Sequence, residues 1–255
     1  MTPHFENAES YDRFMGRFSA PLAKRFVEAI APTDGDLALD VGCGPGALTK
    51  ELIDALGAGQ VSAVDPSEPF VSAARSRFPG ADIQIARAES LPYPDDTFDL
   101  TLSQLVIHFI ADPVVAIREM ARVTRRGGRI AANVWDFKGS RGPLGVFQQA
   151  ALDLDPAASV SEITRGTGEG DMLEMVTRAG LTDVTTGELT VDITFPTFAE
   201  WWDPFTLGIG PAGAYVVALE PDRRAELERH ARTLLPAIPF TIDATAWTVI
   251  GRTPR

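Results

Sequence analysis

The stretch Leu37-Ala38-Leu39-Asp40-Val41-Gly42-Cys43-Gly44-Pro45-Gly46 decides the fold. Its first half is a short apolar run and its second half is a cluster of glycines, which predicts a buried strand that ends in a tight turn. Residues 47–56, which follow the turn, carry apolar side chains at helical spacing. A strand, a glycine turn and a helix in this order predict the first half of a βαβ unit, the building block of a parallel sheet.

The same alternation continues on both sides of this stretch. Ser19 is placed to cap a helix over residues 19–30, and Pro21 suits its first turn. Downstream, the patterns predict strands over 61–64, 83–86, 98–103 and 130–135, and helices over 67–78 and 112–124. Gly127 and Gly128 are expected to separate the last helix from the strand that follows. The alternation predicts an α/β fold, a parallel sheet with helices on both faces.

Beyond Trp135 the alternation stops. A helix is predicted over 169–179, and residues 184–195 and 240–251 alternate as strands do. Residues 196–238, between these two strands, are too many for a turn and are predicted to form an inserted cap over the strand ends, where sheet enzymes bind ligands. Within it we expect a charged helix over 222–234 and a flexible loop over 208–213. Its aromatic residues either form the core of the cap or line an acceptor pocket; they are Trp201, Trp202, Phe205 and Tyr215.

The composition limits the classes of partner. The chain has 255 residues, enough for a single domain over 1–255, and a formal net charge of −12. An acidic protein repels phosphate backbones and anionic lipids, so we expect neither nucleic acid nor membrane as a partner. The only cysteine, Cys43, excludes an internal disulfide, and the polar start of the chain does not resemble a secretory signal, so we expect a cytoplasmic protein. No cluster has metal-ligand spacing, so we expect no metal.

The glycine loop leaves two ligand classes open. Gly42, Gly44 and Ala47 satisfy the dinucleotide pattern, which predicts a nicotinamide-dependent oxidoreductase. However, Pro45 lacks an N–H for a pyrophosphate, and the carboxylate of Asp40 would repel one. That carboxylate would attract a cationic ligand, and S-adenosylmethionine carries an ammonium, a sulfonium and no phosphate. We therefore favour S-adenosylmethionine as the cofactor.

Four segments in series resemble the class I S-adenosylmethionine-dependent methyltransferases, specifically the small-molecule group called type 11. They are residues 37–46, 64–67, 88–99 and 118–128, and the resemblance covers residues 11–135. It implies a Rossmann-like sheet of seven strands whose last strand is antiparallel. It also implies in-line transfer of a methyl group to a small-molecule acceptor. A protein that binds the cofactor without turnover is a further alternative.

The resemblance also implies which residues hold the nucleoside. Asp65, at the end of the second predicted strand, would accept hydrogen bonds from the ribose hydroxyls, although an aspartate there can also cap the next helix. Pro66 would flank the adenine. Ala88, through its N–H, and Glu89 would border the adenine edge.

The other end of the cofactor would lie near the strand ends and the N-terminal segment. Ser103 and Gln104 would contact the methionine part and face the acceptor. Residues 1–30 would form a lid, in which Tyr11 and Arg17 reach the methionine carboxylate, a role suited to the arginine fork. The alternative for Arg17 is a solvated side chain on an amphipathic helix. The loop residues implied to line the methionine and ribose are Gly42, Gly44 and Gly46.

His108 is the best candidate for a general base. It follows the fourth predicted strand, and histidine titrates near neutral pH. A base is required only when the acceptor must lose a proton. The alternative is a histidine that packs beside Phe109 or hydrogen-bonds the backbone.

Overall fold

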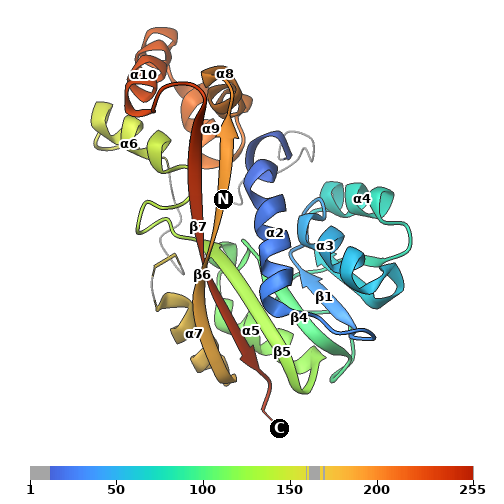
Figure 1. The fold of residues 1–255 in the computed structure, drawn as a ribbon. Coiled ribbons are helices and arrows are strands. Elements are labelled where there is room, and N and C mark those ends of the chain that lie inside the picture. Colours follow the sequence, from blue (N-terminus) through green and yellow to red (C-terminus); the bar gives the residue numbers. More distant parts are fainter. Residues whose placement is uncertain (1–11, 159, 161–166, 169, 255) are drawn as a thin grey trace.

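The computed structural model describes residues 12–158, 160, 167–168 and 170–254. Within these residues lies a seven-stranded sheet in the order β3-β2-β1-β4-β5-β7-β6 (Figure 1). Strands β1 to β5 are parallel, and β7 runs antiparallel to both of its neighbours, which confirms the predicted fold class. The strands are β1 Ala38–Val41, β2 Val61–Asp65, β3 Asp82–Ile85, β4 Phe98–Gln104, β5 Thr124–Trp135, β6 Thr182–Phe195 and β7 Phe240–Arg252.

Helices cover both faces of this sheet. On one face α2 (Arg17–Ile30) and α3 (Ala47–Leu56) bury apolar side chains against β1, β4 and β5. On the other face α5 (Pro113–Val123) and α7 (Asp171–Ala179) pack together with a second apolar cluster. Helix α4 (Glu68–Arg77) follows β2 and packs against β2 and β3. No helix of the described residues is both long and apolar enough to cross a membrane.

The start of β5 corrects one expectation. We predicted that Gly127 and Gly128 separate a helix from a strand, but α5 ends at Val123 and β5 begins at Thr124, so both glycines lie inside the strand. A Cβ atom on Gly128 would lie 2.6 Å from Cγ2 of Thr124 and 3.0 Å from the carbonyl oxygen of Asp99. The glycine therefore allows β5 to pass close to the start of β4, where their pairing also changes register.

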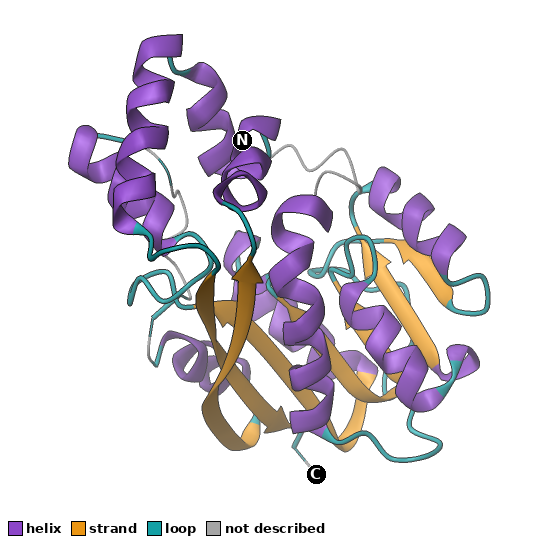
Figure 2. Ribbon diagram, turned by 45° about the horizontal axis from the view of Figure 1, so that its top comes forward, coloured by secondary structure: helices purple, strands orange, loops and turns teal. Residues whose placement is uncertain are grey.

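The residues between β6 and β7 fold as helices. They are α8 (Phe198–Trp202), the 3-10 helix η4 (Asp203–Leu207), α9 (Gly210–Ala218) and α10 (Pro221–Leu234). Together with α6 (Gly145–Leu154) they form the helical group at one end of the sheet (Figure 2). We call residues 196–238 the insertion. Its role as a cap over a ligand stays a prediction.

The predicted flexible loop over 208–213 is wrong, because α9 begins at Gly210. Pro211 lies in the first turn of that helix, where its missing N–H has no cost. A Cβ atom on Gly213 would lie 2.8 Å from the carbonyl carbon of Gly208. Gly213 is therefore required for close packing of the chain on itself, and composition alone does not distinguish that use from flexibility.

Three of the four aromatic residues considered in the insertion belong to the core, whereas Tyr215 is half-buried at its edge. Trp201, Trp202 and Phe205 are each at most 4% exposed. They share one apolar cluster with Phe18 of α2 and Trp135 at the end of β5. The insertion is therefore packed onto the sheet through large apolar side chains, which contribute roughly 1.5–3 kcal/mol each when buried.

Candidate functional site

The loop between β1 and α3 uses its three glycines in two different ways. All have positive φ angles, +80° at Gly42, +53° at Gly44 and +100° at Gly46. A Cβ atom on Gly42 would lie 2.5 Å from the side chain of Val106, and one on Gly46 would lie 2.4 Å from that of Phe78. At Gly44 the nearest atom would be 4.0 Å away. At Gly42 and Gly46 the space of a side chain is therefore occupied by other residues of the protein. At Gly44 that space is open to a ligand.

Asp65 lies at the end of β2 and holds this loop. One carboxylate oxygen accepts a hydrogen bond from the N–H of Gly44 at 2.9 Å, and the other from the N–H of Ser67 at 2.8 Å. Burial raises the pKa of Asp65, and these two N–H groups oppose that effect. The carboxylate of Asp65 therefore binds the glycine loop. It also supports the start of α4, because Ser67 is the N-cap residue of that helix.

Asp40 places a second carboxylate beneath the loop. It is 1% exposed, and its Oδ2 accepts a hydrogen bond from the hydroxyl of Thr49 at 2.7 Å. Its Oδ1 is enclosed and has no hydrogen-bond partner among the described residues. Burial is the main reason that the pKa of Asp40 is raised to about 7; the hydrogen bonds from Thr49 oppose this effect, and the nearby charge of Asp65 adds to it. A cationic ligand group would stabilise the ionised form.

A short turn next to β2 carries the residues expected at the adenine edge. The N–H of Ser90 donates to the carbonyl of Arg87 at 3.1 Å, which closes a turn over Ala88 and Glu89. The N–H of Ala88 has no hydrogen-bond partner within the described chain, although the residue is only 8% exposed. We call residues 87–90 the base-edge turn. Pro66, the other residue expected beside the adenine, is exposed.

Ser103 and Gln104 are buried at the end of β4 and bind other parts of the protein. The hydroxyl of Ser103 donates to the carbonyl of Val41 at 3.0 Å. The side-chain amide of Gln104 donates to the carbonyl of Ser19 at 2.9 Å and so connects β4 to α2. The Oε1 atom of Gln104 has no partner among the described residues.

Arg17 joins α2 to the insertion. Its guanidinium donates to the carbonyl of Glu200 at 3.2 Å, lies 3.7 Å from the carboxylate of Glu200 and lies over the ring of Phe195 at 5.5 Å. Tyr11, which we expected beside it, lies outside the described residues. Just before Arg17, Asp12 pairs with Arg77 at 2.6 Å, and Arg77 also donates to the carbonyl of Pro45 at 3.0 Å. The segment therefore contacts the insertion directly and is linked to the glycine loop through Arg77.

His108 lies in the 3-10 helix η3 (Ile107–Phe109), just after β4. Its ring centroid lies 4.1 Å from that of Phe109 and 6.0 Å from that of Phe137. Its Nδ1 is enclosed and has no partner in the described part of the chain, and burial lowers the pKa of His108 to about 3. The imidazole is therefore neutral at pH 7, which fits a packing role and opposes the uptake of a proton. No group of three or more histidine, cysteine or carboxylate side chains in the described chain suits a metal ion.

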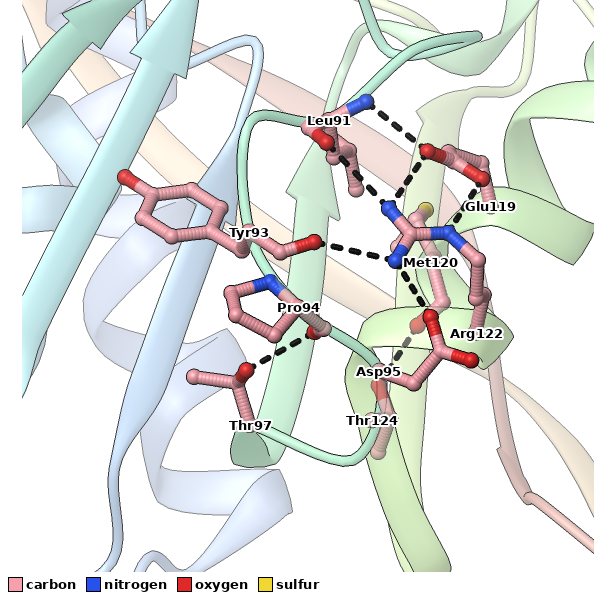
Figure 3. Close-up of polar contacts among 9 residues, drawn as sticks. All are labelled: Leu91, Tyr93, Pro94, Asp95, Thr97, Glu119, Met120, Arg122 and Thr124. Carbon is pink, nitrogen blue, oxygen red and sulfur yellow. Dashed lines mark hydrogen bonds and ion pairs between the residues drawn. The ribbon is translucent and has the colours of Figure 1, made fainter.

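Glu119 and Arg122 are residues that the sequence analysis did not single out. They lie one turn apart on α5 and contact residues 91–95, which follow the base-edge turn (Figure 3). Their spacing is the signal that was available, because oppositely charged side chains three residues apart on a helix meet. What they contact depends on the tertiary fold and is not visible in the local pattern.

Comparison with known proteins shows which family this chain resembles. A family model described as a methyltransferase domain matches residues 39–132. The aklanonic acid methyltransferase DauC of Streptomyces sp. (strain C5) is 29% identical over 132 residues, which are 49% of this chain and 60% of that protein. The chain spans 33%, 60% and 41% of the lengths of the first three curated relatives.

Solved structures share the fold at lower identity. The geranyl diphosphate C-methyltransferase of Streptomyces coelicolor A3(2) is 13% identical with a TM-score of 0.55, over 93% of this chain and 80% of that chain. That structure contains Mg²⁺, geranyl diphosphate and S-adenosyl-L-homocysteine. The [4+2]-cyclase SpnF is 20% identical with a TM-score of 0.58, over 92% of this chain and 81% of that chain. These likenesses establish the fold, and the cyclase indicates that the fold is not confined to one reaction.

Proposed function

The chain belongs to the class I S-adenosylmethionine-dependent methyltransferases of the type 11 group, and on this basis we propose that it transfers a methyl group from S-adenosylmethionine to a small-molecule acceptor. The observation that carries the proposal is the pairing of an open position at Gly44 with the unpartnered carboxylate oxygen of Asp40. Because Asp40 is enclosed beneath the loop, a ligand cation bound at Gly44 would stabilise the ionised carboxylate by charge rather than by a direct hydrogen bond. A pyrophosphate there would be repelled by the same carboxylate.

The residues of the site fit this cofactor. Gly44 would approach the ligand through its backbone, and Asp65 would exchange its hydrogen bond with the loop for ribose hydroxyls. The free N–H of Ala88 would donate to the adenine edge, and Glu89 would lie beside it. Tyr11, Arg17, Ser103 and Gln104 keep their proposed roles at the methionine end. Gly42 and Gly46 would line it through their backbone alone, because their missing side chains make space for Val106 and Phe78.

Methyl transfer requires alignment more than acid–base chemistry. When bound, the cofactor supplies a methyl group on a sulfonium sulfur, and the electron pair of the broken S–C bond returns to sulfur as the acceptor forms its bond to carbon. The protein has to hold the acceptor in line with that bond and exclude water. Residues 12–30 and the insertion would provide this closure. For an acceptor that loses a proton, His108 remains the candidate base, and it could act only if the bound acceptor raised the low pKa of its buried imidazole.

A small-molecule acceptor is supported by the relatives and by charge. DauC is named for aklanonic acid, and one structural neighbour is named for geranyl diphosphate. The net charge of −12 disfavours a polyanionic nucleic-acid acceptor. The single cysteine supports a cytoplasmic location, where thiols remain reduced.

Calorimetric titration tests the cofactor assignment. We expect S-adenosylmethionine and S-adenosylhomocysteine to bind and NAD to show no heat above dilution. Binding of NAD alone would overturn the proposal in favour of an oxidoreductase. Asp65→Ala should weaken S-adenosylhomocysteine binding without unfolding the protein.

Turnover needs an assay of its own, because cofactor binding does not establish methyl transfer. Release of S-adenosylhomocysteine would be measured across a panel of small hydroxy, carboxy and amino compounds. An acceptor-dependent rate supports the proposal. Tight cofactor binding without release on any acceptor would point to a binding protein.

A further inference from the structure

Glu119 and Arg122 form a two-point ion pair on α5 (Figure 3). The Nε of Arg122 donates to one carboxylate oxygen of Glu119 at 2.9 Å, and its Nη2 donates to the other at 2.7 Å. This fork geometry is the strong form of an arginine–carboxylate contact. The hydrogen bonds from Arg122 lower the pKa of Glu119, so the carboxylate is ionised at neutral pH.

The pair holds the chain that follows the base-edge turn. The Nη2 of Arg122 donates to the carbonyl of Leu91 at 3.2 Å, and Glu119 accepts a hydrogen bond from the N–H of Leu91 at 3.0 Å. The Nη1 of Arg122 donates to the carbonyl of Tyr93 at 2.9 Å and to the carboxylate of Asp95 at 2.7 Å. Arg122 thus makes five hydrogen bonds, as many as a guanidinium has N–H donors.

Another glutamate–arginine pair of the chain lacks this arrangement. Glu174 and Arg178 lie on α7 at 3.5 Å, and their side chains are 71% and 65% exposed. The side chains of Glu119 and Arg122 are 19% and 32% exposed. An exposed pair contributes little, whereas a pair that also satisfies both backbone groups of a loop residue constrains that loop.

The base-edge turn is therefore held at both ends. Before it, the N–H of Ala86 donates to the carbonyl of Asp65 at 3.2 Å, and after it Leu91 is held by Glu119 and Arg122. The free N–H of Ala88 lies between these two attachments. Its position thus depends on Asp65, the candidate ribose ligand, and on the ion pair of α5.

We propose that Glu119 and Arg122 are positioning residues that fix the base-edge turn and so set the selectivity for adenine. This inference rests on the proposed function, because it assigns the turn to the base of the cofactor. Adenine offers the N1 lone pair to a backbone N–H, whereas hypoxanthine carries a proton on N1. A turn held in one place would distinguish the two bases, and a loosened turn would do so less well.

The first experiment uses the protein without cofactor. Amide hydrogen exchange of residues 86–97 would be compared between wild type, Arg122→Gln and the matched control Arg118→Gln, which changes an exposed arginine of the same helix. We expect the exchange of Leu91 to rise about tenfold or more in Arg122→Gln, the loss expected for hydrogen bonds to a charged group. The control and the glycine loop should be unchanged.

The second experiment measures base selectivity by calorimetry. S-adenosylhomocysteine and S-inosylhomocysteine, which carries hypoxanthine, would be titrated into the same proteins. We expect wild type to bind the adenine ligand more tightly than the hypoxanthine ligand. In Arg122→Gln, this preference, expressed as the Kd of the hypoxanthine ligand divided by that of the adenine ligand, should fall about two- to tenfold. Arg122→Lys should restore part of the ratio, because a lysine keeps the charge without the fork. Glu119→Gln provides a second variant if Arg122→Gln does not fold.

The outcomes separate the two proposals. Unchanged exchange at Leu91, or an unchanged ratio of Kd values in folded variants, would overturn the positioning role while the cofactor assignment stands. Wild type that binds neither ligand would overturn the proposed function itself. A narrowed ratio together with faster exchange supports both.

Discussion

The glycine loop and the insertion are specified by different kinds of information. The loop of residues 40–46 is fixed by backbone geometry, with a positive φ angle at each of its three glycines. The insertion is held by large aromatic side chains that meet residues from distant parts of the chain, such as Trp135 and Phe147. The first region carries a pattern that can be read locally. The sequence of the insertion shows only that it is rich in aromatic residues. Its structure depends on which distant parts of the chain these side chains pack against.

Removing an aromatic side chain from the insertion should have the largest effect on stability. The ring of Phe205 stacks on Phe147 at 4.3 Å and meets the edge of Phe14 at 5.1 Å. Phe205→Ala should lower the free energy of unfolding by about 3–5 kcal/mol, measured by denaturant titration. The control Leu207→Ala truncates a side chain that is 38% exposed and should cost much less. Equal losses would mean that the insertion is not part of the folded core.

A substitution of Asp40 tests whether this buried carboxylate lowers the stability of the protein while it favours ligand binding. Between its usual pKa of 3.8 and the folded value of about 7, only the unfolded state ionises this group. The contribution of Asp40 to stability is therefore greatest below pH 3.8 and falls as pH rises through this window, by up to about 4 kcal/mol. Asp40→Asn removes this dependence while its amide oxygen still accepts from Thr49.

Thermal unfolding from pH 4 to 8 measures this difference. We expect Asp40→Asn to be more stable than wild type at pH 8 and similar near pH 4, and to bind S-adenosylmethionine more weakly. Lower stability of the variant at pH 8 would contradict the burial effect.

A substitution of Gly46 tests whether this glycine is needed for packing against Phe78. Gly46→Ala places a methyl group against Phe78 at a φ of +100° and should cost about 2–4 kcal/mol from strain and overpacking. Gly57→Ala is the matched control, since Gly57 has a φ of +87° and no atom within 4 Å, so it reports strain alone. Gly44→Ala should resemble this control in stability but weaken cofactor binding. Denaturant titration of all three variants separates the two effects.

The sequence predicted the parts of the fold that have local patterns. Six strands and helix α3 were placed within two residues of their ends, and Asp65 was placed at the end of the second strand. The hydrogen bond from Gly44 to Asp65 was not predicted. The partner of Gly42 is Val106, which is far along the chain, and nothing near Gly42 indicates it. For the same reason the packing role of Gly213 and the contacts of Arg122 were not predicted.

Arg17 connects the two regions and should show the smallest effect. Its side chain is 36% exposed and that of Glu200 is 42% exposed, so solvent screens their charges. A double-mutant cycle of Arg17→Gln and Glu200→Gln should give a coupling free energy of about 0.5 kcal/mol, within the range of exposed pairs. The exposed pair Lys50 and Asp54, at 2.6 Å on α3, serves as the control cycle. If Arg17 also binds the methionine carboxylate, Arg17→Gln should weaken S-adenosylhomocysteine binding more than Glu200→Gln does. Equal and small changes in affinity would leave Arg17 as a contact between α2 and the insertion alone.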